Sequence, residues 1–160
     1  MNSKSHSDSA LTPENLLSPS AIKFLFELHR EFEPRRKTIL RDRTSCSIHE
    51  LLTKVPRDNT AWSVATIPDA LKDRTVEITG PAEPKMIINA LNSGANVFMA
   101  DFEDSLSPTW SNVITGHVAL QNALRRVLEF TNDQGKTYRL NQESLATLIV
   151  RPRGWHLSEN

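Results

Sequence analysis

Charged side chains follow two apolar runs in the second half of the chain. The first run, at residues 97–100, leads into Asp101, Glu103 and Asp104. The second, at residues 146–150, leads into Arg151 and, two residues later, Arg153. Carboxylates buried without partners are costly, so three of them closing an apolar strand indicate a specific use. A carboxylate beside a guanidinium would orient a bidentate clamp for a small carboxylate substrate, and the guanidinium would keep the acids ionised.

Strand geometry predicts which of these side chains meet. Side chains alternate along a strand, so Asp101 and Glu103 are expected on one face and Asp104 on the other. Arg151 and Arg153 share a face of the later strand. Neighbouring strands lie about 4.8 Å apart, so Asp101 or Glu103 can reach Arg151 if the two strands are adjacent. A buried ion pair that only fixes the register of the strands is the alternative interpretation.

The other reactive residue types give weaker indications. His156 and Gly154 follow Arg153 closely enough to line the same pocket. His117 is expected on a helix, and Cys46 is expected to be an unreactive thiol because no partner base is evident. No His/Cys cluster has zinc spacing. The acids of residues 101–104 suit a hard cation such as Mg²⁺, but no metal ligand is assigned within this chain. Phosphoacceptor domains also end a buried strand in an aspartate, and nothing else supports that interpretation.

The pattern along the chain predicts a helical section followed by alternating strands and helices. A helix is expected from Pro19, capped by Ser18 and kinked or ended by Pro34, with a second helical piece at residues 35–43. An apolar stripe at three- and four-residue steps marks the first of these helices. Strands are expected at residues 75–79, 96–104 and 146–151, with helices at 85–92 and 111–130 and a small hairpin around 132–136. This alternation is typical of an α/β fold with a parallel sheet, either open or closed into a barrel.

Composition excludes several classes of protein. The 160 residues carry 19 basic and 19 acidic side chains, so a nucleic-acid binder that relies on a basic surplus is disfavoured. No run of about 18 apolar residues could cross a membrane. The first 17 residues lack the apolar centre of a secretory signal. The single cysteine gives no internal disulfide and suggests a reducing compartment.

Four segments together resemble malate synthase, in its shorter form found in bacteria and in plant and fungal glyoxysomes. They are residues 74–81, 85–94, 97–105 and 150–157. The resemblance extends over about residues 20–160 and implies a TIM-type barrel preceded by a helical clasp. The expected organisation is a flexible arm at 1–20, a clasp at 21–73, and the first three strands and two helices of the barrel at 74–160. Pro84 departs from the family pattern, which usually has Arg or another polar residue there.

The resemblance also implies a reaction. Malate synthases condense acetyl-CoA with glyoxylate and water, using Mg²⁺, to give (S)-malate and CoA. Arg151 matches the arginine that holds glyoxylate and stabilises the enolate, and Asp101 and Glu103 match the acids that position it. The catalytic-base aspartate and the Mg²⁺ ligands of the family lie in the part that follows residue 160, so this piece is expected to be inactive alone.

Two other functions stay open. A truncated homologue could act as a binding or interaction module, and a different carboxylate-handling barrel enzyme of the lyase type could share the acidic strand end. A cytoplasmic location is expected, with the glyoxysome or peroxisome as the alternative. The sequence gives no oligomeric state.

Overall fold

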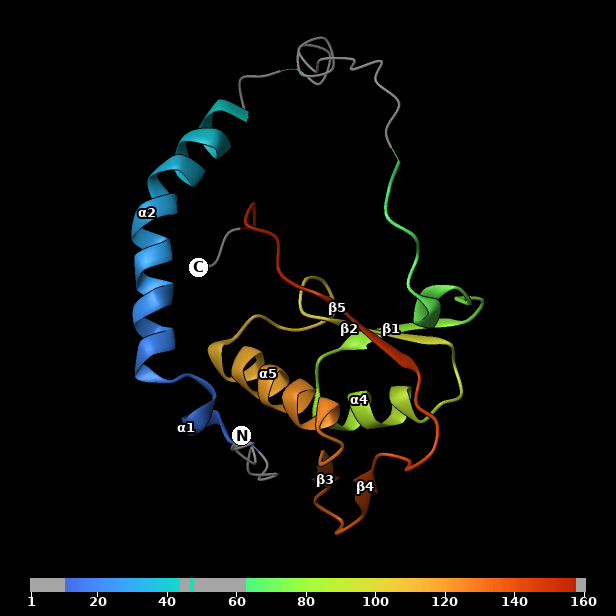
Figure 1. The fold of residues 1–160 in the computed structure, drawn as a ribbon. Coiled ribbons are helices and arrows are strands. Elements are labelled where there is room, and N and C mark those ends of the chain that lie inside the picture. Colours follow the sequence, from blue (N-terminus) through green and yellow to red (C-terminus); the bar gives the residue numbers. More distant parts are fainter. Residues whose placement is uncertain (1–10, 44–46, 48–62, 158–160) are drawn as a thin grey trace, which may run out of the picture. The chain divides into compact units, whose positions relative to one another are not determined.

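The computed structural model describes residues 11–43, 47 and 63–157 (Figure 1). In chain order its elements are α1 (Pro13–Leu16), α2 (Pro19–Arg43), the 3₁₀ turn η1 (Asp69–Leu71), β1 (Glu77–Pro81), α4 (Pro84–Leu91), β2 (Val97–Asp101), α5 (Trp110–Leu124), β3 (Glu129–Thr131), β4 (Thr137–Arg139) and β5 (Thr147–Arg151). Contacts divide the chain into two units, one comprising residues 18–67 and the other the remainder. The expected boundaries, at residues 20 and 73, stay a prediction, and each unit is described by itself.

A parallel sheet forms the centre of the larger unit. Its strands lie in the order β1-β2-β5, and both pairs are parallel. Helices α4 and α5, which connect these strands, lie on the same side of the sheet (Figure 1). The predicted α/β class with a parallel sheet is therefore confirmed. Three strands do not close a barrel, so the barrel stays a prediction.

The hydrophobic core lies between the sheet and its two helices. Phe98 and Ala100 of β2 are fully buried and join apolar residues of both helices, among them Ile87, Ile88 and Leu120. Both faces of β2 are covered, as its apolar run predicts.

Strand β5 is less covered than the sequence suggests. It was expected to be a buried strand, but Val150 is 47% exposed. Among the described strands β5 lies at the edge of the sheet, so it has a neighbouring strand on one side only. An apolar strand sequence therefore did not distinguish the centre of this sheet from its edge.

Helix α2 runs for 25 residues with Pro34 inside it, so the expectation that the helix ends there is wrong, while the kink given as the alternative stays a prediction. Proline removes one backbone hydrogen bond from a helix interior. Here the neighbouring turn is bridged by Glu33, which accepts two hydrogen bonds from Arg36, of 2.7 and 2.9 Å, and pairs with Lys37 at 3.6 Å. The apolar stripe of α2 is present, but no described residue of the helix is buried.

Helix α5 ends earlier than predicted. Its last residue is Leu124, and Arg126, with φ of 61°, turns the chain. The amide of Val127 then donates to the carbonyl of Asn122 at 2.9 Å, which closes the end of the helix. Phe130, the last residue of the expected helix, instead lies in β3. The predicted hairpin is confirmed, since β3 and β4 pair antiparallel.

Two further features complete the larger unit. Residues 11–17, expected as part of a loose arm, include α1, and Leu11 exchanges two hydrogen bonds with the buried Asn122 of α5, at 2.7 and 3.0 Å. Pro84 opens α4, where its missing amide hydrogen costs nothing. Among the described residues, no helix is both long and apolar enough to cross a membrane.

Candidate active site

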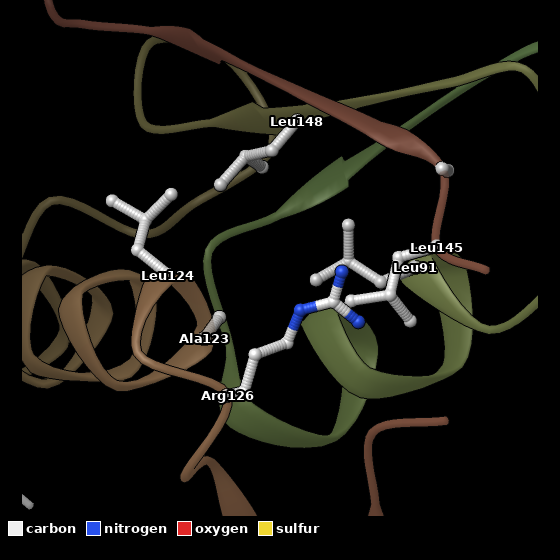
Figure 2. A pocket seen from close by; sticks show the side chains of 7 residues that line it. Leu91, Ala123, Leu124, Arg126, Leu145 and Leu148 are labelled. Carbon is white, nitrogen blue, oxygen red and sulfur yellow. The ribbon is translucent and has the colours of Figure 1, made fainter. Parts of the chain in front are cut away.

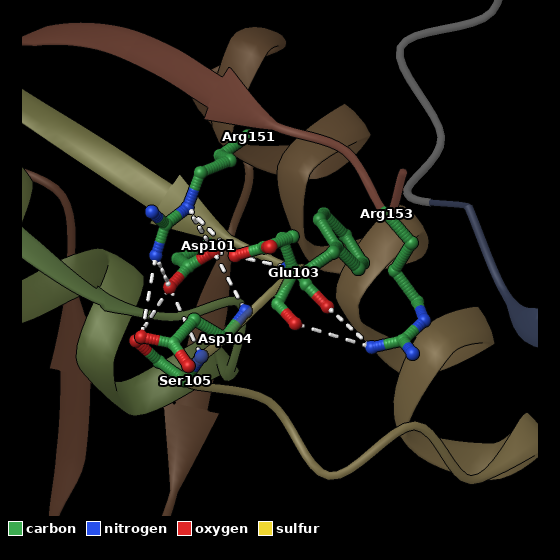
Figure 3. Close-up of polar contacts among 7 residues, drawn as sticks. Asp101, Glu103, Asp104, Ser105, Arg151 and Arg153 are labelled. Carbon is green, nitrogen blue, oxygen red and sulfur yellow. Dashed lines mark hydrogen bonds and ion pairs between the residues drawn. The ribbon is translucent and has the colours of Figure 1, made fainter. Parts of the chain in front are cut away.

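The carboxyl ends of β2 and β5 bring an acid and an arginine together. The parallel register sets Asp101 opposite Arg151. Nε of Arg151 donates to Oδ1 of Asp101 at 2.8 Å, and Nη2 donates to Oδ2 at 2.6 Å (Figure 3). The two strands are adjacent, as the expected geometry requires, and the pair is bidentate, the strongest arrangement for these groups.

Asp101 is the most enclosed polar side chain of this site, with 0% exposure. Besides Arg151, four donors reach its carboxylate: the amides of Glu103, Asp104 and Ser105, at 2.9, 3.2 and 2.9 Å, and the hydroxyl of Ser105 at 2.6 Å. The hydrogen bonds from Arg151 hold the pKa of Asp101 far below its ordinary value. Burial acts in the opposite direction, and Ser105 and the turn amides add to the lowering. Asp101 is therefore a permanent anion that anchors Arg151, whose own pKa it raises.

The chain bends after Asp101 and returns two more carboxylates towards Arg151. Glu103 lies 3.6 Å from Nε of Arg151, and Asp104 lies 3.7 Å from its Nη2. Strand alternation placed Asp104 on the opposite face, and that expectation is wrong. The strand ends at Asp101, so the period of two no longer applies to the residues that follow.

The residues expected to line the pocket have different surroundings. Nη1 of Arg153 donates to the backbone carbonyls of Phe102 and Glu103, at 3.3 and 3.2 Å. His156 is exposed, and its ring lies against Gly154: a Cβ at Gly154 would be 2.5 Å from His156 Cε1. The guanidinium of Arg153 thus contacts the backbone of the acidic turn.

The sequence analysis did not identify the residues of α5 that pack against Phe102 in the turn after β2. Phe102 is 3% exposed and stacks on His117 of α5, with ring centroids 4.7 Å apart. Burial lowers the pKa of His117. A Cβ at Gly116 would lie 2.8 Å from both the Phe102 ring and the carbonyl oxygen of Ala82, so glycine is required for this close approach. The apolar Phe102 between the acids was the available signal.

The site presents a fixed cation at the rim of the sheet. The side chain of Arg151 is 39% exposed, and the buried Asp101 holds one edge of its guanidinium. An arginine held in this way can stabilise negative charge on a small anion without first reorganising. The described part of the chain contains no group of three or more His, Cys, Asp or Glu residues arranged to hold a metal ion. The oxygens of Asp101 are also already engaged, so this acid set does not fit a metal site.

A separate pocket is lined by other residues. It measures about 250 Å³ and is apolar except for Arg126 (Figure 2). Its walls are formed by Leu91, Ala123, Leu124, Arg126, Leu145, Ala146 and Leu148. It contains none of the expected site residues and no carboxylate, so it offers no acid–base chemistry.

Comparison with known proteins relates about nine tenths of the chain to one family. A family model described as malate synthase, N-terminal domain, matches residues 6–46. The malate synthase of Streptomyces clavuligerus is 49% identical over 157 residues, which cover 91% of this chain and 29% of that protein. That of Myxococcus xanthus is 50% identical over 153 residues, covering 90% and 28%. The glyoxysomal malate synthase of Zea mays is 46% identical over 154 residues, covering 90% and 27%.

The resemblance predicted from the sequence is therefore confirmed. The chain is similar to the N-terminal portion of malate synthases over about nine tenths of its own length. It spans less than a third of the length of these relatives.

Proposed function

We propose that this chain, as the counterpart of the N-terminal portion of malate synthases, supplies the substrate-binding arginine of that enzyme. The reaction joins acetyl-CoA and glyoxylate and, with water, releases (S)-malate and CoA. The observation that carries the proposal is the bidentate Asp101–Arg151 pair at the carboxyl ends of β2 and β5. Catalytic groups collect at this end of parallel strands in α/β barrels.

Arg151 is the catalytic residue of the proposal. Its exposed edge would bind the carboxylate or the aldehyde oxygen of glyoxylate. It would also stabilise the enolate formed when the acetyl methyl group loses a proton. A fixed cation lowers the barrier to such a step because negative charge develops beside it in the transition state. Asp101 would keep the guanidinium in place and charged, and Glu103 would help to orient it.

The metal ligands and the catalytic base of the proposed reaction are not assigned to residues of this chain. Mg²⁺ is the expected cofactor, but the acids of this site do not fit a metal site, so no step involves the metal here. The catalytic base and the metal ligands are expected in the part of the family that corresponds to residues beyond 160. Arg153, Gly154 and His156 stay proposed as neighbours of the substrate.

The proposed architecture is the beginning of a TIM-type barrel. In the register of the sheet Thr79, Met99 and Ile149 share the face that is opposite the core residues Phe98 and Ala100. That face would become the inside of a barrel, and it carries Asp101 and Arg151 at its carboxyl end. The helices would then form the outer layer.

Two experiments test the function. The 160-residue chain alone is expected to show no cleavage of acetyl-CoA that depends on glyoxylate. A chimera, in which this chain replaces the corresponding portion of the Streptomyces clavuligerus enzyme, is expected to make malate from the two substrates. A folded chimera with no activity would contradict the proposal. Turnover by the 160-residue chain alone would contradict the expectation that the catalytic base and the metal ligands are not among its residues.

A binding or interaction module is the second candidate, because the larger unit has a hydrophobic core of its own. A soluble chain that unfolds cooperatively in urea and is monodisperse in the ultracentrifuge would favour this candidate. Aggregation would count against it, since apolar side chains such as Val150 are exposed at the sheet edge. A cytoplasmic location is proposed with either function, although relatives named as glyoxysomal keep that compartment as an alternative.

A further inference from the structure

Both the backbone amides and the backbone carbonyls of the turn after β2 make hydrogen bonds with charged side chains. Its amides, at Glu103, Asp104 and Ser105, donate to the carboxylate of Asp101. Its carbonyls, at Phe102 and Glu103, accept hydrogen bonds from Arg153. The carboxylate of Asp101 thus accepts from the amides of the turn, and the guanidinium of Arg153 donates to its carbonyls.

The two arginines of the β5 end therefore have different tasks. Figure 3 shows Arg151 and Arg153 reaching the turn from its two sides. Arg151 contacts carboxylate side chains, whereas Arg153 contacts backbone carbonyls. Hydrogen bonds to a charged donor are stronger than neutral ones, so the loss of Arg153 would loosen the carbonyl side of the turn.

The turn decides where two of the three acids lie. Glu103 and Asp104 come within 3.6 and 3.7 Å of Arg151 because the chain bends directly after Asp101. Phe102, buried against His117, fixes one end of this bend. Arg153 binds the backbone carbonyls of Phe102, which carries that buried ring, and of Glu103, which carries the first returning carboxylate.

We propose that Arg153 is a positioning residue: it fixes the turn at Phe102 and Glu103 and so sets the acids around Arg151, without binding the substrate itself. This inference rests on the proposed function, because it assigns Arg153 to the support of the catalytic arginine. It gives Arg153, proposed above as a neighbour of the substrate, the task of holding the turn rather than of binding the substrate. Both hydrogen bonds to the turn come from Nη1, so this end of the Arg153 guanidinium is committed to the carbonyls of Phe102 and Glu103.

Amide hydrogen exchange tests the contact without relying on activity. Arg153→Met removes the donors and keeps most of the stem, whereas Arg153→Lys keeps a charged donor. In the chain and in the chimera, Arg153→Met is expected to speed exchange at the turn amides of Glu103 and Asp104 by about tenfold. Arg153→Lys is expected to restore much of the protection, and the amides within β2 serve as the internal reference for folding.

Arg126 provides the matched control. Its Nη1 also donates to a backbone carbonyl, that of Asn141, at 3.3 Å. Arg126→Met is expected to leave exchange at Glu103 and Asp104 unchanged. Equal effects of the two Met variants on that turn would overturn the proposal.

The kinetics of the chimera separate positioning from substrate binding. Arg153→Met is expected to lower kcat on the order of tenfold with little change in the KM for glyoxylate, because misplacing catalytic groups mainly affects the transition state. A raised KM with normal exchange at the turn would show that Arg153 binds substrate and would overturn the proposal. Lower stability with unchanged kcat would also overturn it.

The two proposals fail in different ways. If the folded chimera with the unaltered chain makes no malate, the proposed function fails, and the exchange experiment still decides whether Arg153 holds the turn. If the chimera is active but Arg153→Met changes neither exchange nor kcat, the function stands and the role of Arg153 is wrong.

Discussion

Two arginine–carboxylate pairs in different regions of this chain have nearly the same geometry. On α2, Arg36 donates to Glu33 at 2.7 and 2.9 Å, and at the sheet rim Arg151 donates to Asp101 at 2.8 and 2.6 Å. The first pair spans three residues and the second spans fifty. The Glu33 side chain keeps 17% exposure, whereas that of Asp101 has none.

The comparison teaches that hydrogen-bond geometry alone does not identify a functional pair. Glu33 and Arg36 are brought together by the helix itself, and such local pairs add little to stability. Asp101 and Arg151 meet only because two parallel strands are in register, and the carboxylate must be desolvated to be there. The Asp101–Arg151 pair therefore forms only in the folded sheet. It leaves part of the Arg151 side chain exposed, where it can bind an anion.

The largest expected difference between the two pairs is in activity. In the chimera, Arg151→Lys is expected to reduce malate formation on the order of a hundredfold or more, because lysine cannot reproduce the bidentate contact or the spread of its charge. Arg36→Lys, the matched change on α2, is expected to leave activity unchanged. The measurement is the steady-state rate of CoA release with both substrates present. Similar losses in the two variants would remove the distinction between the pairs.

The next largest effect is on stability. Asp101→Asn keeps the shape of the side chain but removes the charge that Arg151 requires. It is expected to lower the free energy of unfolding by about 3 kcal/mol, since it breaks a pair whose acid is buried. Glu33→Gln is expected to change little. Urea unfolding followed by circular dichroism compares the two, and a larger loss for Glu33→Gln would contradict the burial argument.

A smaller effect on the free energy of unfolding is expected at Gly116 of α5, which packs closely against Phe102 of the turn. In Gly116→Ala the new Cβ must displace Phe102 or the Ala82 backbone. Overpacking of this kind costs about 1–3 kcal/mol. Thr115→Ala, at the exposed neighbouring position of α5, is expected to change the free energy of unfolding by less than about 0.5 kcal/mol. Equal urea midpoints for the two variants would show that the turn can move away from α5.

The same contrast explains what could be predicted from the sequence. The strands and the parallel sheet follow from apolar runs and their alternation with helices, and these patterns are local. That the strands of Asp101 and Arg151 are neighbours was a condition of the expected contact, and the structure meets it. The bend after β2 combines local hydrogen bonds, from residues 103–105 to Asp101, with distant contacts from Arg151 and Arg153, and strand alternation accounts for neither. Asp104 was therefore assigned to the wrong face, and the contact of Arg153 with backbone carbonyls was not foreseen.

Helix ends were predicted least well, for a related reason. The helix end expected at Pro34 followed from a rule about one residue, and the helix continues through it. The helix expected at residues 111–130 was extended by the apolar Val127 and Leu128, which follow the end of α5 at Leu124 and precede β3. Periodicity reports which residues are apolar, but it does not report which element buries them.

Acid titration provides the finest comparison of the two pairs. Hydrogen bonds from Arg36 lower the pKa of Glu33 to about 2, and those from Arg151 lower the pKa of Asp101 further. Both folded values lie below the unfolded ones, near 4, so each pair stabilises the chain above about pH 4 and loses that contribution as the pH falls. Carboxyl-carbon NMR is expected to show Glu33 titrating near pH 2 while Asp101 is still ionised, with Glu33→Gln and Asp101→Asn identifying the signals. If Asp101 instead gained its proton at a higher pH than Glu33, burial would outweigh its six hydrogen bonds, and Asp101 would be no permanent anchor for Arg151.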